Sequence, residues 1–270
     1  MNEKPTRVPP RILCDYLLSQ GRSAIQLPQA AELMGITEQG ASDAFMGLRS
    51  KAAFFSPARG LYIAIPPQYR SWKVVPAMDF IDAMMQALDR KYYVALLSAA
   101  ELHGAAHQRP QVFQVMVDKQ LAPRDLGRVQ IKFYSRKHLS EIPVTKINSA
   151  SGQVRISTPA ATALDLATRS IDAGGLGNVA TVLFELFEEK KISPEEVIAT
   201  SAHFPDASLR RLGWLLDLVD APLDRDQLAN HLARRPATRA GSLLDSHGSR
   251  TGHTNKRWSL VINTNVEPDL

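Results

Sequence analysis

The chain has 270 residues, of which 44% are hydrophobic and 22% are charged, and its formal net charge is +5. This is the composition of a folded protein with enough apolar residues for two cores, and its basic charge is compatible with nucleic acid. The single cysteine, Cys14, excludes an internal disulfide and is expected in a core. No apolar run approaches the roughly 20 residues of a membrane span. The polar first ten residues lack a signal peptide's apolar segment, so we expect a cytoplasmic protein with no membrane partner.

Three short helical patterns with tight joints open the chain. The second spans residues 28–34 and begins with a proline, which suits the first helical turn. Gly35 and Ile36 form the next joint, and Thr37 is a good N-cap for a third helix over residues 38–50. The first pattern spans residues 9–20 and is expected to bury the following side chains: Ile12, Leu13, Tyr16 and Leu17.

A β-hairpin pattern follows the third helix. Residues 53–55 and 60–65 resemble strands around a turn at residues 56–59, and a double proline ends the unit. A helix presented after a tight turn, beside a basic hairpin, can read the major groove of DNA. We therefore predict a winged helix-turn-helix DNA-binding domain over residues 1–68, with double-stranded DNA as its partner.

The third helix has one apolar and one polar face. Ala41, Ala44, Phe45 and Leu48 form the apolar stripe that should pack inside the domain. On the other face, polar groups can bond to base edges or phosphates, and Gly40 and Gly47 would permit close approach to a DNA backbone or to another helix. Lys51 closes the helix, and Arg59 is expected at the wing tip. The candidate DNA-binding residues are Thr37, Gln39, Ser42, Arg49, Lys51 and Arg59.

The remaining residues, 69–270, are predicted to form a larger domain with a mostly β middle and a helical second half. This order gives an α/β (α+β) fold class. Residues 237–255 are rich in Gly, Ser, Thr, Arg and His and are expected to be flexible. Predicted helices begin at Pro76 and span residues 96–103, 158–167, 176–189, 193–202, 207–219 and 224–234; predicted strands span residues 112–117, 129–134, 144–147, 154–157 and 258–262.

Several segments, taken in order, resemble AbiEi-type antitoxin regulators. They are LRSK at 48–51, RGLY at 59–62, LSAAELHG at 97–104, ISTP at 156–159, ALDL at 163–166, RRLGWLL at 210–216 and WSLVIN at 258–263. The resemblance implies a winged-helix domain that binds promoter repeats. It also implies a C-terminal domain that counters a nucleotidyltransferase-like toxin, with or without physical contact. The chain departs from the family pattern at Ala52-Ala53, where a glycine is common, and in the long loop from Ala237.

Catalytic alternatives are weaker. His103 and His107 have a spacing that could share a metal, but no third ligand is near in sequence. Asp118-Lys119 follows a strand, as in metal-dependent nucleases, without the second acidic residue that those enzymes need. We therefore expect no enzyme activity, no metal and no cofactor. A DNA-targeted nuclease or phosphotransferase remains the alternative, and a winged helix that binds protein is a third hypothesis.

Basic residues also cluster outside the N-terminal region. A possible secondary basic surface surrounds the second predicted strand of the larger domain, where Lys132, Tyr134 and Arg136 alternate opposite Ile131 and Phe133. A solvated strand face is an equally good interpretation. Asp165 lies in an apolar helix and would need a partner if buried, for which Arg169 is one turn away. The members of the basic surface are Arg128, Lys132, Arg136 and Lys137.

Overall fold

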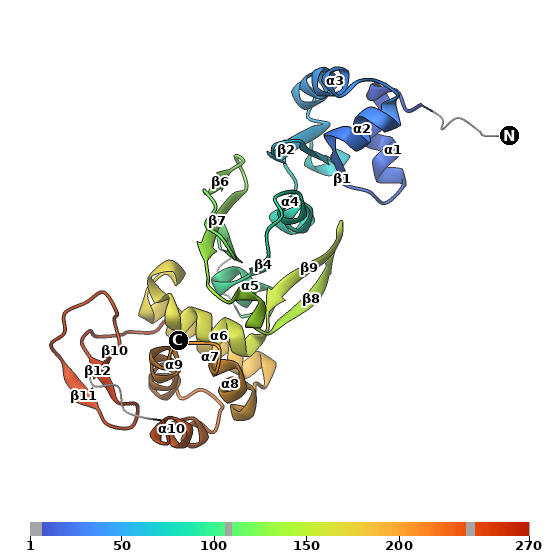
Figure 1. The fold of residues 1–270 in the computed structure, drawn as a ribbon. Helices are drawn as coiled ribbons and strands as arrows, with labels where there is room; N and C mark the ends of the chain where they lie inside the picture. The colour runs from blue at the N-terminus through green and yellow to red at the C-terminus, as the bar shows by residue number, and fades with distance from the viewer. Residues whose placement is uncertain (1–6, 106–109, 236–240, 270) are drawn as a thin grey trace. The chain divides into compact units, whose positions relative to one another are not determined.

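The chain divides into two units that are each built from separate stretches of sequence. The computed structural model describes residues 7–105, 110–235 and 241–269, and Figure 1 labels their helices and strands. The first unit comprises Met1–Tyr92, Gln111–Lys137 and Lys146–Arg155, and the second comprises Tyr93–Pro110, His138–Thr145 and Ile156–Leu270. The fold is mixed α/β, as predicted. Among the described residues, none of the helices is long and apolar enough to span a bilayer.

The first unit begins with three helices and a small sheet. A 3-10 turn, Pro10–Ile12, precedes α1 (Leu13–Ser19), and β1 (Ala24–Gln26) leads into α2 (Leu27–Met34) and α3 (Glu38–Ser50). The strands β2 (Phe54–Ala58) and β3 (Leu61–Ala64) then form an antiparallel hairpin, and β1 pairs with β3 on its other side. The predicted third helix is confirmed in both bounds.

Three details of this region differ from the sequence predictions. Because the first turn is 3-10, Ile12 and Tyr16 are exposed, while Leu13 and Leu17 are fully buried. The strand β1 was not predicted, since three residues give too short a pattern. The hairpin turn is shorter than expected because β2 continues through a register shift between Phe55 and Ala58.

The single cysteine, Cys14, lies in the core of this module. Cys14 lies in the same buried cluster as Leu13, Leu17 and Phe45, which confirms its core position. Its thiol donates to the carbonyl oxygen of Ala53 at 3.3 Å. Burial raises the pKa of the Cys14 thiol. The cysteine is therefore a small apolar core residue rather than a reactive group.

The rest of the first unit is mostly strand. After 3-10 turns at Pro67–Tyr69 and Ala77–Asp79, α4 (Ile81–Ala87) buries Ile81, Met84 and Met85. The strands β5 (Val112–Val117) and β7 (Gln130–Ser135) run parallel, and β6 (Arg124–Asp125) pairs antiparallel with β7. β8 (Val144–Ser149) and β9 (Gly152–Ser157) are neighbours joined by a two-residue connection.

The second unit is a helical assembly around α6 (Pro159–Thr168). In α6 eight consecutive residues, from Ala160 to Ala167, are buried, and the helix contacts α5, α7, α8 and α9. Small side chains let so many helices approach it. The other helices are α5 (Leu96–Leu102), α7 (Leu176–Lys190), α8 (Pro194–Ser201), α9 (Asp206–Leu218) and α10 (Arg225–Ala233), with a 3-10 turn at Leu139–Glu141 and another at Ser170–Ala173.

The segment expected to be flexible contains ordered strands where it is described. β10 (Ser242–Leu243) and β11 (His253–Asn255) flank β12 (Leu260–Ile262) in a three-stranded sheet. The expectation fails because backbone pairing with β12 and the buried ring of Trp258 hold a polar, glycine-containing stretch that has no apolar periodicity of its own. Residues 237–240 lie outside the described residues.

Candidate nucleic-acid interface

The joint between α2 and α3 is a tight turn set by local sequence. Gly35 caps α2 in the left-handed conformation, with φ 66°, where a glycine is favoured. A Cβ at this position would also lie 2.5 Å from the Nε atom of Arg7. The hydroxyl of Thr37 accepts a hydrogen bond from the backbone N–H of Gly40 at 3.2 Å, which confirms the predicted N-cap. The direction of α3 is therefore fixed at its first turn.

The apolar face of α3 is locked onto the hairpin by aromatic contacts. Phe45 is fully buried, and its ring stacks on that of Tyr62 in β3 with a centroid distance of 3.6 Å. The ring of Phe54 in β2 meets Phe45 edge-on at 5.1 Å. Ala41 and Leu48 complete the buried stripe. The helix and the hairpin consequently hold each other in one orientation.

The opposite face of α3 is polar and exposed. Gln39 and Arg49 are exposed on it, and Ser42 is half-buried. The Nε2 amide of Gln39 donates to Asp43 Oδ1 at 3.0 Å, so Asp43 points along the helix surface and its charge lies among the candidate contacts. A face with hydrogen-bonding groups and a terminal cation can meet base edges and phosphates.

Three cations, Arg49, Lys51 and Arg59, lie on or beside this face. Lys51 is exposed at the end of α3 and Arg59 at the hairpin turn, and Thr37 is exposed at the start of the helix. Among the described residues, Arg49, Lys51 and Arg59 take part in none of the ion pairs, so their charges are not neutralised within that part of the chain. Uncompensated cations beside a helix favour phosphate binding.

The two glycines of α3 have no packing role among the described residues. A Cβ at Gly47 would meet nothing within 4 Å, and one at Gly40 would meet Thr37 Oγ1 no closer than 3.4 Å. The close internal helix contact that could have explained them is therefore absent from the described structure. The missing side chains of these glycines leave space at the surface of α3.

The possible secondary basic surface is only partly exposed. Lys132 lies on β7 with its Nζ atom 5.0 Å from the ring centre of Tyr134, but Tyr134 is buried and accepts a hydrogen bond from Gln114. The expected open strand face is therefore wrong at Tyr134, which is buried and pairs with Met116 of β5. Arg128 stacks over Trp72 at 5.4 Å. Lys137 is exposed and Arg136 is half-buried.

Asp165 is the only buried acidic residue in the described second unit, and one of its partners lies far from it in the sequence. It lies on α6, and Tyr93 Oη donates to its Oδ2 at 3.0 Å from a position 72 residues earlier. Arg169, expected beside Asp165, forms a salt bridge with Asp172 at 3.0 Å. A buried carboxylate that accepts a tyrosine hydrogen bond ties α6 to the start of this unit.

The two histidines considered as metal ligands are not both described. His107 lies outside the described residues. His103 is buried, and its Nε2 atom lies 2.8 Å from the carbonyl oxygen of Ser157, so this nitrogen carries the proton. Burial lowers the pKa of His103. Among the described residues, no cluster of three His, Cys, Asp or Glu side chains is placed to hold a metal.

Asp118, the residue that follows β5, lies in a turn. Asp118 Oδ1 accepts from the backbone N–H of Lys119 at 3.0 Å, and the backbone N–H of Asp118 donates to the carbonyl of Lys91. These bonds are those of a polar turn at the end of a strand, the interpretation that the sequence favoured over a nuclease carboxylate.

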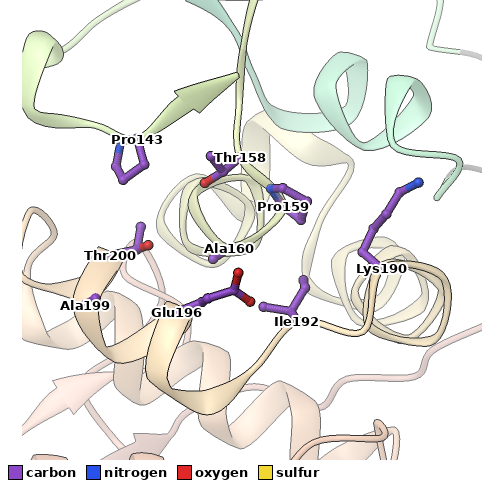
Figure 2. A pocket seen from close by; sticks show the side chains of 9 residues that line it. All are labelled: Pro143, Thr158, Pro159, Ala160, Lys190, Ile192, Glu196, Ala199 and Thr200. Carbon is purple, nitrogen blue, oxygen red and sulfur yellow. The ribbon is translucent and has the colours of Figure 1, made fainter. Parts of the chain in front are cut away.

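The second unit contains a pocket of about 280 Å³ at the start of α6 (Figure 2). Of its lining residues, Lys190 and Glu196 carry charge. Glu196 accepts from the backbone N–H of Ser193 in the capping box of α8, so its carboxylate is already used to start that helix. The pocket is lined by Pro143, Thr158, Pro159, Ala160, Lys190, Ile192, Glu196, Ala199 and Thr200.

Comparisons with known proteins found a similar solved fold and a matching family model. A crystal structure of the RV2827C protein from Mycobacterium tuberculosis has a similar fold, with a TM-score of 0.64 and 16% sequence identity over 95% of this chain and 93% of that chain. At such identity the likeness establishes the fold alone. A comparison with curated proteins finds no match.

The family comparison is more specific. The model of the AbiEi antitoxin C-terminal domain matches residues 93–218. The matched segment begins at Tyr93, the first residue of the second unit, and ends with α9. It contains both Tyr93 and Asp165, which form the buried hydrogen bond. The match supports an antitoxin role in a toxin–antitoxin system. Residues 93–218 are therefore similar to the C-terminal domain of AbiEi-type antitoxins.

Proposed function

We propose that the protein is a sequence-specific DNA-binding autorepressor and the antitoxin of a type IV toxin–antitoxin system, countering a nucleotidyltransferase-like toxin. The antitoxin part of this proposal rests on the family match over residues 93–218. The DNA-binding part rests on α3, whose capped and stacked geometry presents an exposed polar face beside uncompensated cations.

The N-terminal module acts in this proposal as a winged helix-turn-helix domain, with a boundary after Gln68. α3 enters a major groove of the promoter, and Gln39, Ser42 and Arg49 contact base edges or phosphates. Thr37 and Lys51 bind phosphates at the two ends of the helix, and Arg59 on the hairpin binds a phosphate or the adjacent minor groove. Occupation of promoter repeats then blocks transcription.

A mobility-shift titration tests the repressor part directly. The purified full chain is titrated against the DNA upstream of its own gene at two salt concentrations, with unrelated DNA as competitor. Retardation that resists the competitor and weakens at the higher salt concentration supports the proposal. Retardation that the competitor abolishes equally would reduce the module to a nonspecific basic surface and favour the alternatives of a protein-binding or catalytic role.

The antitoxin part needs a separate experiment. The neighbouring gene is expressed from an inducible promoter, with and without this chain expressed from an unrelated promoter, and growth is measured. We expect the chain to restore growth. The doubly substituted Arg49→Ala, Arg59→Ala chain should restore growth as well, because DNA contact is not needed when transcription is uncoupled. Failure of the unmodified chain to restore growth would refute the pairing with that gene.

A further inference from the structure

Met46 is the most exposed of the large hydrophobic side chains on the described surface. Its side chain lies on α3 and is 70% exposed, whereas Ala41, Phe45 and Leu48 of the same helix are buried. Scattered apolar residues on a surface are common, so exposure alone assigns no role. The position of Met46 among its neighbours on α3 points to a role.

Met46 lies on the same helix face as Gln39, which the proposed function places against DNA. Gln39, Asp43 and Met46 follow one another at intervals of four and three residues, which puts them on one face of α3. Gly47, the next residue, leaves open space, since a Cβ there would meet nothing within 4 Å. Met46 therefore projects from an unobstructed part of the helix.

The chemistry of a methionine suits one feature of the major groove. Thymine displays a C5-methyl group there, and an apolar side chain that contacts it discriminates thymine from bases without the methyl group. The unbranched thioether of methionine is flexible and polarizable, so it can adapt to such a small target. Gln39 and Asp43, which are hydrogen-bonded to each other, cannot supply an apolar contact.

We propose that Met46 is a specificity-determining residue that contacts the C5-methyl group of a thymine in the operator. This inference rests on the proposed function, because it requires α3 in the major groove. Asp43 then faces the neighbouring base pair, where its carboxylate accepts from the amino group of a cytosine or adenine. In that position the Asp43 carboxylate lies near a base and not beside a phosphate, whose negative charge would repel it.

The test removes the methyl group from the DNA and the side chain from the protein. The protected operator is found by footprinting, and each of its thymines is replaced in turn by deoxyuridine, which lacks only the C5-methyl group. Affinities are measured for the unmodified chain, Met46→Ala and the control Ile171→Ala, whose side chain is 59% exposed in the second unit. Circular dichroism verifies that each variant is folded.

We expect at least one deoxyuridine to weaken binding of the unmodified chain by roughly fourfold, the value of one buried methyl group. The same replacement should leave the affinity of Met46→Ala unchanged within twofold, while Ile171→Ala should behave like the unmodified chain. Specific binding that is insensitive to every deoxyuridine would overturn the inference and leave the repressor proposal standing. Undiminished sensitivity in Met46→Ala would do the same. Absence of specific binding by the unmodified chain would overturn both.

Discussion

The ring of Phe45 lies parallel to that of Tyr62, with an interplanar angle of 4° and a centroid distance of 3.6 Å. Phe45 belongs to α3 and Tyr62 to β3, so this stack joins the helix that carries candidate contacts to the hairpin. Phe45 is fully buried, whereas Tyr62 is half-buried. The stack thus couples the fold of the module to the placement of its exposed surface.

This coupling can be measured by a double-mutant cycle. We expect Phe45→Leu and Tyr62→Leu each to lower the free energy of unfolding, and their combination to cost less than the sum by about 0.5–1.5 kcal/mol. Urea denaturation of the four proteins gives the coupling. Additive effects would show that the two rings contribute only through the area they bury.

Loss of the cations should weaken DNA binding selectively. Arg49→Ala or Arg59→Ala should each cost about 1–3 kcal/mol in affinity for the upstream DNA. Each should also make the salt slope shallower by about one unit for every phosphate contact that is lost. The control is Arg234→Ala, which removes an exposed arginine at the end of α10. Unchanged binding by both N-terminal variants would remove α3 and the wing from the interface.

Two glycines should respond to alanine in opposite directions. Gly47→Ala should raise the free energy of unfolding by about 1 kcal/mol, because alanine favours the helix and the added Cβ meets nothing within 4 Å. Gly213→Ala should lower it by about 1–3 kcal/mol, because its Cβ would lie 2.2 Å from the ring of Trp258. Thermal or urea unfolding distinguishes the two.

The same Gly47→Ala protein provides a functional readout. If α3 approaches a DNA backbone at Gly47, the more stable variant should bind the operator more weakly. A variant that is more stable and binds equally well would show that this glycine serves neither folding nor DNA contact.

His103 should make stability fall in acid. Burial is the main cause that lowers its pKa, and the charge of Lys190 adds to it, whereas the carbonyl of Ser157 opposes the shift. The unfolded chain therefore takes up the proton first as the pH falls below about 6.5, the ordinary value for histidine. The stabilisation is present above that pH and is lost as the pH falls toward the lowered pKa of the folded state.

Urea midpoints at pH 8 and pH 5.5 measure this effect. The decrease between the two should be smaller in His103→Gln than in the unmodified chain, whereas His247→Gln, at an exposed position, should match the unmodified chain. An equal decrease in all three proteins would assign the acid sensitivity to other groups.

Local signals predicted the elements that depend on local chemistry. Thr37 and Thr158 both cap helices through their hydroxyls, and the helix after each begins where the sequence placed it. The residues Val112 to Val117 form a strand with the expected bounds because a short run rich in valine, interrupted only by Gln114, favours a buried strand. The structure of a long or well-capped segment can therefore be predicted from its own residues.

What the sequence did not reveal depends on contacts between distant residues. Tyr134 is buried through its place beside β5, and Asp165 finds Tyr93 from the other end of a domain. Ile12 and Tyr16 are exposed because a 3-10 turn shifts the register of α1, which a periodicity of 3.6 does not anticipate. Gln39 and Arg49 were placed on the exposed face of α3 by periodicity alone, and the roles of all the candidate DNA contacts stay predictions.

The interleaving of the two units limits how the protein can be dissected. The second unit draws Tyr93 from one stretch and Asp165 from another, with segments of the first unit between them in the chain. A chain that began anywhere between residues 94 and 155 would contain only part of each unit and would leave the Asp165 carboxylate without its tyrosine. Repression and toxin neutralisation therefore have to be separated by point substitutions in the intact chain, because deletion variants with ends in that interval would report misfolding in place of function.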